Sequence, residues 1–171
     1  MTLNEKVANI LKEHKEGEEF FNTLDMMIRG DRDILEDFID FALMGMSNLT
    51  DTIRFTSFFP VLVLTGKFGI TIINNYEEDL RKYFGDIVLV NGGLRKDENP
   101  VILKQSVKGN SLYFWDDSIY SGNTRNKIVK AIQEMNPKAE LVKSFVVYDG
   151  MKQREENTKA MFRYYGNSSS L

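Results

Sequence analysis

The chain has 171 residues, of which 42% are hydrophobic and 27% are charged. This length and composition are typical of a soluble globular protein, so we expect residues 1–171 to form a single domain. The absence of cysteine excludes disulfides, thiol catalysis and cysteine-based metal sites. A net charge of −3 and scattered basic residues disfavour general nucleic-acid binding. No apolar run reaches the roughly 20 residues that span a bilayer. We therefore expect a cytoplasmic protein that binds neither membranes nor nucleic acid.

The first third of the chain has helical periodicity. Thr2 and Glu5 have the spacing of a capping box, and apolar residues at helical spacing follow in three stretches. We expect residues 1–57 to form a helical N-terminal segment, whose phenylalanine and methionine residues suit core packing or an oligomer contact. The only histidine, His14, stands in a charged stretch, and we expect it to be a solvated surface residue. The sequence therefore lacks a suitable histidine for serine-hydrolase chemistry or for a histidine-based zinc site.

The rest of the chain alternates apolar runs with helical patterns. Five runs have the composition of buried strands: residues 58–64, 87–90, 101–103, 112–115 and 141–148. Two stretches have helical periodicity: residues 70–84 and 124–135. Strands that alternate with helices imply an α/β fold, here a Rossmann-like, mainly parallel sheet of about five strands with right-handed crossovers.

The most informative stretch follows the run at residues 112–115. In open α/β sheets, ligands bind beyond the carboxyl ends of the strands. Gly122 permits a tight turn whose amides point at an anion, and the next helix adds unpaired N–H groups. With the hydroxyls of Ser121 and Thr124, this end of the loop suits a phosphate. Asp116 and Asp117 would repel phosphate, whereas carboxylates accept hydrogen bonds from vicinal sugar hydroxyls. The loop is therefore predicted to hold a phosphorylated ribose.

Residues Leu112–Thr124 resemble the phosphoribosyl pyrophosphate (PRPP) loop of the type I phosphoribosyltransferase family. That loop has four apolar residues, two acidic ones and a short stretch that ends in Thr-Gly-x-Thr. Ser118 stands where the family usually has an apolar residue and Ser121 replaces the commoner threonine, so the chain looks like a divergent member. The resemblance implies that the ribose 5-phosphate is bound by Asp116, Asp117, Ser118, Ile119, Tyr120, Ser121, Gly122, Asn123 and Thr124. It implies Mg²⁺ carried mainly by oxygens of PRPP and water, with Asp116 and Asp117 as the acidic groups within reach.

A weaker resemblance covers about residues 58–165, the expected phosphoribosyltransferase-like core. Thr65-Gly66-Lys67 stands where the family binds pyrophosphate, with Lys67 as the cation; an ordinary turn with a surface lysine explains it equally well. Residues 145–150 occupy the place where the family often contacts the base. The family's flexible catalytic loop corresponds to residues 91–100, with Arg95 and Lys96 as phosphate ligands. This loop is short and would cover a site poorly.

The implied activity is displacement of pyrophosphate from PRPP by a nucleobase, in which Asp116, Asp117 and Lys67 are the catalytic candidates. The main alternative is a PRPP- or nucleotide-binding regulator that keeps the fold without turnover. The segment 1–57 would then be a surface for a protein partner or a second copy of the chain; in an enzyme it would be a hood that selects the base. The plainest alternative is an α/β domain whose acidic pair only caps a helix. Walker and dinucleotide glycine motifs are absent from the sequence.

Overall fold

The computed structural model describes residues 59–91, 98–104 and 106–163, and the helical segment expected over residues 1–57 lies outside them. The described elements are β1 (Pro60–Thr65), α4 (Gly66–Arg81), β2 (Asp86–Val90), β3 (Ser111–Ile119), α5 (Asn123–Met135), β4 (Glu140–Asp149) and β5 (Thr158–Arg163). Within this part of the chain, no helix is long and apolar enough to cross a membrane.

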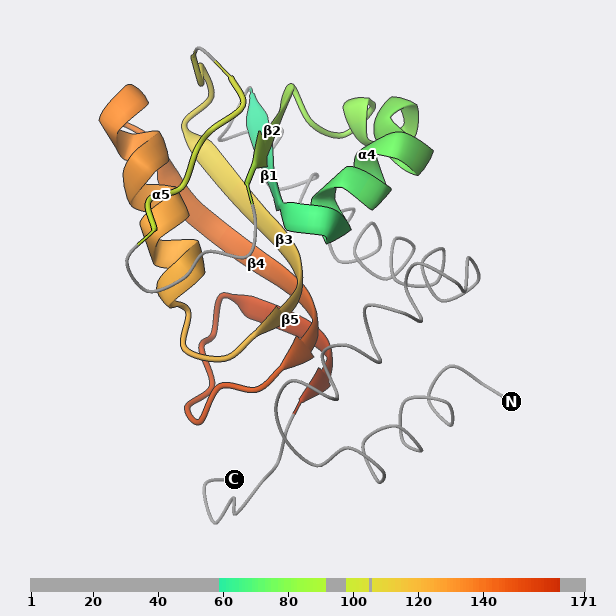
Figure 1. Cartoon of the computed structure of the whole chain (residues 1–171), viewed down its shortest axis with the longest axis vertical. Coiled ribbons are helices and arrows are strands. Elements are labelled where there is room, and N and C mark those ends of the chain that lie inside the picture. The colour runs from blue at the N-terminus through green and yellow to red at the C-terminus, as the bar shows by residue number, and fades with distance from the viewer. Residues whose placement is uncertain (1–58, 92–97, 105, 164–171) are drawn as a thin grey trace. The chain divides into compact units, whose positions relative to one another are not determined.

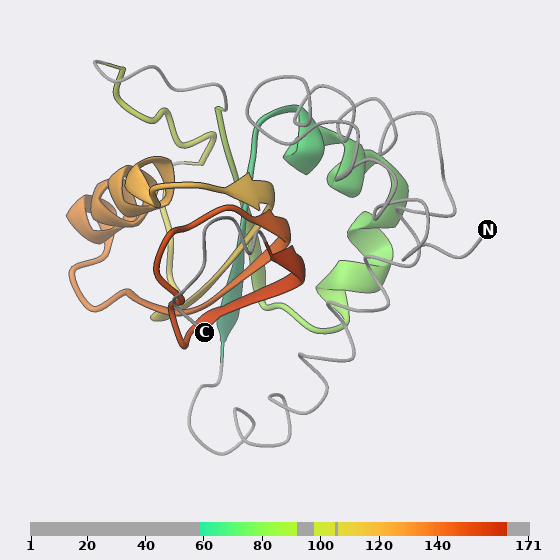
Figure 2. The same ribbon diagram turned by 90° about the horizontal axis from the view of Figure 1, so that it is seen from below.

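The strands form one sheet in the order β2-β1-β3-β4-β5, and every neighbouring pair is parallel. The predicted α/β fold with a parallel sheet of about five strands is thereby confirmed. From β1 the chain passes through α4 to β2, which lies toward one edge of the sheet. From β3 it passes through α5 to β4, which lies toward the other edge. Because such crossovers are right-handed, this reversal puts the two helices on opposite faces. Figures 1 and 2 show α4 and α5 on either side of the sheet.

Both faces of β3 are buried, which explains the continuous apolar run in its sequence. Leu112 and Phe114 belong to the core beneath α5, together with Ile128 and Ile132 of that helix. The rings of Tyr113 and Trp115 pack toward the other helix: Trp115 meets Phe68 of α4 edge to face at 5.8 Å between ring centroids. A strand covered on both faces needs apolar side chains at every position.

The expectation of a strand at residues 101–103 is wrong. Only an isolated antiparallel bridge joins Ile102 to Val90, and Val101 and Leu103 are exposed. The segment lies against the edge of β2 through a bond from the Leu103 N–H to the Leu89 carbonyl (3.0 Å). The sheet reaches five strands instead through β5, which the sequence did not reveal because its only apolar residues, 160–162, are flanked by Lys159 and Arg163.

Helix α4 begins at Gly66, four residues before the helical stretch expected at residues 70–84, so the turn that follows β1 is shorter than expected. The chain turns within one residue, Gly66, at a φ of 64° that favours glycine. Gly69 then lies inside the helix, where it is pressed against the sheet. A Cβ there would lie 2.9 Å from Leu89 Cδ1 and 3.0 Å from Leu64 Cβ. This glycine therefore allows close packing of α4 on β1 and β2.

Candidate functional site

The order of the strands reverses between β1 and β3, and ligands in open α/β sheets bind at the carboxyl edge where such a reversal occurs. β1 pairs with β3 as far as Leu64 opposite Trp115, whereas β4 continues along β3 as far as Asp149 opposite Ile119. The residues 116–119 therefore extend β3 beyond the level at which β1 ends. The acidic pair, expected in a loop, belongs to this extended part of the strand, and the loop itself is only residues 120–122.

Asp116 and Asp117 are adjacent carboxyl groups in the extended part of β3. Asp117 is buried, and its Oδ1 accepts a hydrogen bond from Ser118 Oγ (3.3 Å). Asp116 is partly buried, and its Oδ1 accepts the backbone N–H of Asp117 (2.8 Å). Burial, and after it the charge of Asp117, raises the pKa of Asp116 well above its usual value. The two carboxyl groups offer oxygens that accept hydrogen bonds, which suits the two neighbouring hydroxyls of a sugar.

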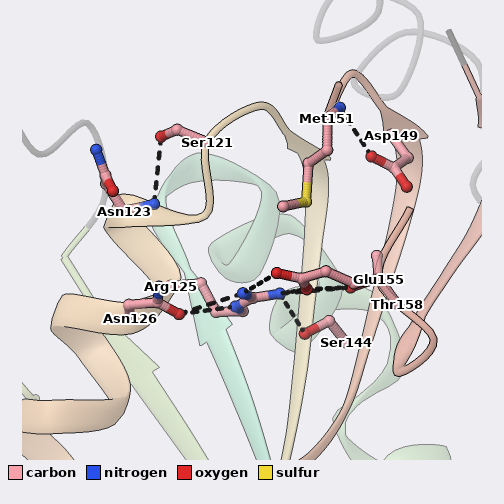
Figure 3. A network of polar contacts seen from close by, with 9 residues as sticks. All are labelled: Ser121, Asn123, Arg125, Asn126, Ser144, Asp149, Met151, Glu155 and Thr158. Carbon is pink, nitrogen blue, oxygen red and sulfur yellow. Dashed lines mark hydrogen bonds and ion pairs between the residues drawn. The ribbon is translucent and has the colours of Figure 1, made fainter. Parts of the chain in front are cut away.

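The turn after β3 has the shape expected for an anion-binding loop. Gly122 is in the left-handed conformation, with a φ of 78°, and directly precedes the first residue of α5. Ser121 Oγ accepts the N–H of Asn123 at 3.3 Å (Figure 3), and Ser121 and Asn123 are both exposed. The next helical bond runs from the N–H of Asn126 to the carbonyl of Gly122 (2.9 Å). The positive end of the α5 dipole thus follows the acidic pair after only residues 118–122.

A buried arginine beneath this turn was not foreseen. The guanidinium of Arg125 donates to both carboxylate oxygens of Glu155, at 2.7 and 3.0 Å, and its side chain is only 7% exposed. It also donates to the hydroxyls of Ser144 (3.3 Å) and Thr158 (3.4 Å), and to Asn126 Oδ1 (3.2 Å). Figure 3 shows the guanidinium between the start of α5 and the residues from β4 and β5. Arg125 therefore ties the turn at Gly122 to the crossover between β4 and β5.

This crossover is unusually short. Residues 150–157 alone return the chain so that β5 can run parallel to β4, with Thr158 opposite Ser144. Parallel strands generally need a dozen or more residues for such a connection. The sequence held one signal for the missing contact: Arg125 lies in the first turn of α5, which has no acidic residue and where a cation opposes the helix dipole. A carboxylate from elsewhere in the chain was required, and Glu155 supplies it.

The other predicted site residues are only partly described. Thr65 precedes α4 and follows Leu64, the partner of Trp115, so the Thr65-Gly66 turn lies beside Asp116 in the register of the sheet. Lys67 is in the first turn of α4, but the position of its side chain lies outside the described part.

Arg95 and Lys96 also lie outside the described residues. The two ends of their loop are tied together: Asn91 N–H bonds the Val101 carbonyl (3.1 Å), and Val101 N–H bonds Asn91 Oδ1 (2.6 Å). Ser118 and Ile119 are buried strand residues, whereas Tyr120 is exposed. The residues predicted to contact a base, 145–150, lie at the end of β4 beside β3.

Among residues 59–91, 98–104 and 106–163, no group of three or more His, Cys, Asp or Glu side chains could hold a metal ion by itself. The carboxyl pair nevertheless suits Mg²⁺, because this ion is commonly held by one or two carboxylates together with water and phosphate oxygens. A magnesium ion that arrives with a phosphorylated ligand would fit this donor set.

No protein-family model and no curated protein matches this sequence. Among solved structures, the purine phosphoribosyltransferase of Pyrococcus horikoshii is 13% identical, with 74% of this chain and 83% of that chain covered and a TM-score of 0.47. The adenine phosphoribosyltransferase of Thermoanaerobacter pseudethanolicus is 12% identical, with 80% of this chain and 84% of that chain covered and a TM-score of 0.48. A hypoxanthine phosphoribosyltransferase of Staphylococcus aureus is 16% identical, with 67% of this chain and 67% of that chain covered and a TM-score of 0.43.

Proposed function

We propose that the chain binds PRPP with Mg²⁺ and transfers the phosphoribosyl group to a nucleobase, with release of pyrophosphate. The observation that carries this proposal is the connection from β3 to α5. A carboxyl pair, a left-handed glycine and a helix N-terminus follow one another within residues 116–124. The carboxyl pair suits the ribose hydroxyls. The amides of the helix N-terminus, with the hydroxyls of Ser121 and Thr124, suit the 5′-phosphate.

The turn beside this connection suits the second phosphate group of such a ligand. Thr65-Gly66 neighbours Asp116 in the sheet, and Gly66 begins α4, whose N-terminus also favours an anion. Lys67 would add a positive charge there. Two anion-binding helix starts at one edge, with a carboxyl pair between them, suit a sugar that carries phosphate groups at both ends.

In the proposed reaction, a nitrogen atom of the base forms a bond to C1 of the ribose while the bond from C1 to the pyrophosphate oxygen breaks. The pair of electrons leaves with pyrophosphate, and the base nitrogen releases its proton to water. Asp116 and Asp117 hold the ribose in place, and Lys67 stabilises charge on the leaving group, with Arg95 as a further pyrophosphate ligand. Mg²⁺ would neutralise part of that charge. Such catalysis depends on positioning and electrostatics and requires no side-chain nucleophile.

We also propose a cytoplasmic enzyme that forms a single domain, in which residues 1–57 are the hood over the site or a contact for another protein. One observation favours the rival function, a PRPP- or nucleotide-binding regulator without turnover. The segment expected to close over the reactants is only residues 91–100, and a loop this short would cover the site poorly.

The proposal is tested by calorimetric titration of Mg²⁺-PRPP into the wild type and into Asp116→Asn/Asp117→Asn. We expect binding by the wild type and its loss, or a weakening of at least about tenfold, in the variant. Glu77→Gln/Asp79→Asn, which removes two exposed acids from α4, is the matched control and should bind like the wild type. If the wild type does not bind at millimolar PRPP, the proposal fails. Pyrophosphate release with a panel of nucleobases then separates an enzyme from a regulator.

A further inference from the structure

Tyr120 is the one residue of the loop between β3 and α5 with a large side chain, and it is not hidden. It is 43% exposed, although it lies next to the buried end of β3. An exposed aromatic ring normally moves freely, and then it would be a poor binding surface. The surroundings of Tyr120 hold it in one position.

Two neighbours at the end of β4 fix the ring. The ring of Tyr148, which is only 6% exposed, packs against it with 5.9 Å between centroids and 59° between planes. Gly150 lies directly against it: a Cβ at this position would be 2.6 Å from Tyr120 Cδ1 and 2.8 Å from Cε1. The Gly150 backbone is itself held by a bond from its N–H to the Ile119 carbonyl (2.8 Å). A glycine is therefore needed here for the ring to lie against the backbone.

The phenol is also close to the carboxyl pair. Burial, and after it the charge of Asp117, raises the pKa of Tyr120. Along the chain, Tyr120 stands between the carboxyl pair suited to ribose hydroxyls and the turn at Gly122 suited to the 5′-phosphate. A sugar held by both would carry the substituent on its C1 within reach of this ring.

From this fixed and exposed ring we infer that Tyr120 is a specificity-determining residue, which stacks on the aromatic base of a nucleoside 5′-monophosphate. The inference rests on the proposed function, because the ribose phosphate must occupy the loop for the base to reach the ring. Stacking on an aromatic side chain depends on the π-face and tolerates different bases. Tyr120 therefore selects a planar base over no base, rather than one base over another.

The test compares two ligands, AMP and ribose 5-phosphate, by calorimetry. We expect the wild type to bind AMP about tenfold or more tightly than ribose 5-phosphate. Tyr120→Leu removes the ring but keeps an apolar side chain, and it should bring the ratio of the two affinities close to one. Tyr120→Phe keeps the ring and should keep the ratio. Tyr83→Leu, which changes an exposed tyrosine between α4 and β2, is the matched control and should also keep it.

Three results would overturn the inference alone, with ribose 5-phosphate still bound. They are equal affinities of the wild type for the two ligands, an unchanged ratio in Tyr120→Leu, and loss of the ratio in Tyr120→Phe, which would assign the effect to the hydroxyl. If the wild type binds neither ribose 5-phosphate nor PRPP, the inference and the proposed function fail together. The two failures are therefore distinguishable.

Discussion

Asp116 is costly to ionise in the native state. Its carboxyl is desolvated and lies beside a second carboxyl, and both conditions raise its pKa. An asparagine of the same shape would avoid this cost while still accepting the N–H of Asp117. Residues that reduce stability in this way are typical of sites whose activity needs them. The same side chain should therefore have opposite effects on stability and on binding.

We expect Asp116→Asn to raise the melting temperature, by an amount that increases with pH. Because the pKa of Asp116 in the native state lies well above its ordinary value, the native state binds the proton more tightly than the unfolded state. The wild type therefore loses stability as the pH rises from about 4 through the native pKa, whereas asparagine does not titrate. Thermal unfolding between about pH 3.5 and pH 8 measures the difference, with Asp79→Asn as the control. A variant that melts below the wild type throughout this range would contradict the expectation.

Arg125 and Glu155 show the reverse case, in which an ionised carboxylate stabilises the fold. The hydrogen bonds from Arg125 lower the pKa of Glu155. The carboxylate thus contributes stability above the usual pKa of a glutamate, and this contribution is lost as the pH falls through the lowered native value. Arg125 is almost wholly buried, so a lost partner leaves a buried charge unpaired.

We expect Glu155→Gln to lower the free energy of unfolding by about 1–2 kcal/mol at pH 7. The loss is limited because water at the exposed side of Glu155 screens its attraction to Arg125. The difference from the wild type should shrink as the pH falls below about 4, where the carboxylate of the wild type is protonated as well. Urea unfolding at both pH values measures this. Glu156→Gln changes a neighbouring exposed acid and should be neutral. Equal losses in the two variants would show that the ion pair with Arg125 has no special weight.

At the scale of the elements, α4 depends on a glycine that its helical propensity alone would disfavour. Gly69→Ala should lower the free energy of unfolding by about 1–3 kcal/mol, because the added methyl meets Leu89 and Leu64 at 3.0 Å or less. An alanine elsewhere in the same helix should instead have a small stabilising effect, and Asn74→Ala, at an exposed position, is the control. Chemical denaturation distinguishes the two. A stabilised Gly69→Ala would mean that the helix can shift away from the sheet at no cost.

The elements differ in how far their sequences predicted them. Residues 60–64 of β1, 87–90 of β2 and 112–115 of β3 are apolar at every position, because these strands are covered on both faces, and such runs are readily recognised. β5 was missed because an edge strand carries charged residues such as Lys159, which protect its edge but break the apolar run. The run at residues 101–103 was apolar and still did not form a strand, because pairing is decided by neighbours that the local sequence does not contain.

The candidate site was predictable in the same uneven way. The order of Asp116, Asp117, Gly122 and the start of α5 is local, so the sequence indicated the turn and its chemistry. The extension of β3 through the acidic pair was not indicated, since it depends on pairing with β4. Arg125 and its partner Glu155 are 30 positions apart, and the arginine in the first turn of α5 indicated that a carboxylate was needed without indicating which one. Contacts over such a separation require the tertiary fold.

At the scale of the whole molecule, both proposed phosphate-binding turns lie at one edge of the sheet, and the opposite edge has no proposed role. We therefore expect Mg²⁺-PRPP to slow amide hydrogen exchange in residues 65–68 and 116–124, because binding suppresses local opening. Residues 82–86 and 136–140, at the start of β2 and β4, are the internal control and should exchange as before. Uniform protection of both edges would indicate general stabilisation rather than a ligand at the carboxyl edge.

The link between Arg125 and Glu155 also has a consequence in time. During synthesis at about 5–20 residues per second, the 30 positions between them correspond to a delay of roughly 1.5–6 s. Throughout this delay α5 has an arginine in its first turn without its carboxylate partner, and the chain that forms β5 has not yet been made. The turn at Gly122 can therefore reach its final form only after the ribosome has added the far end of the crossover, so the binding loop is among the last parts of the described fold to mature.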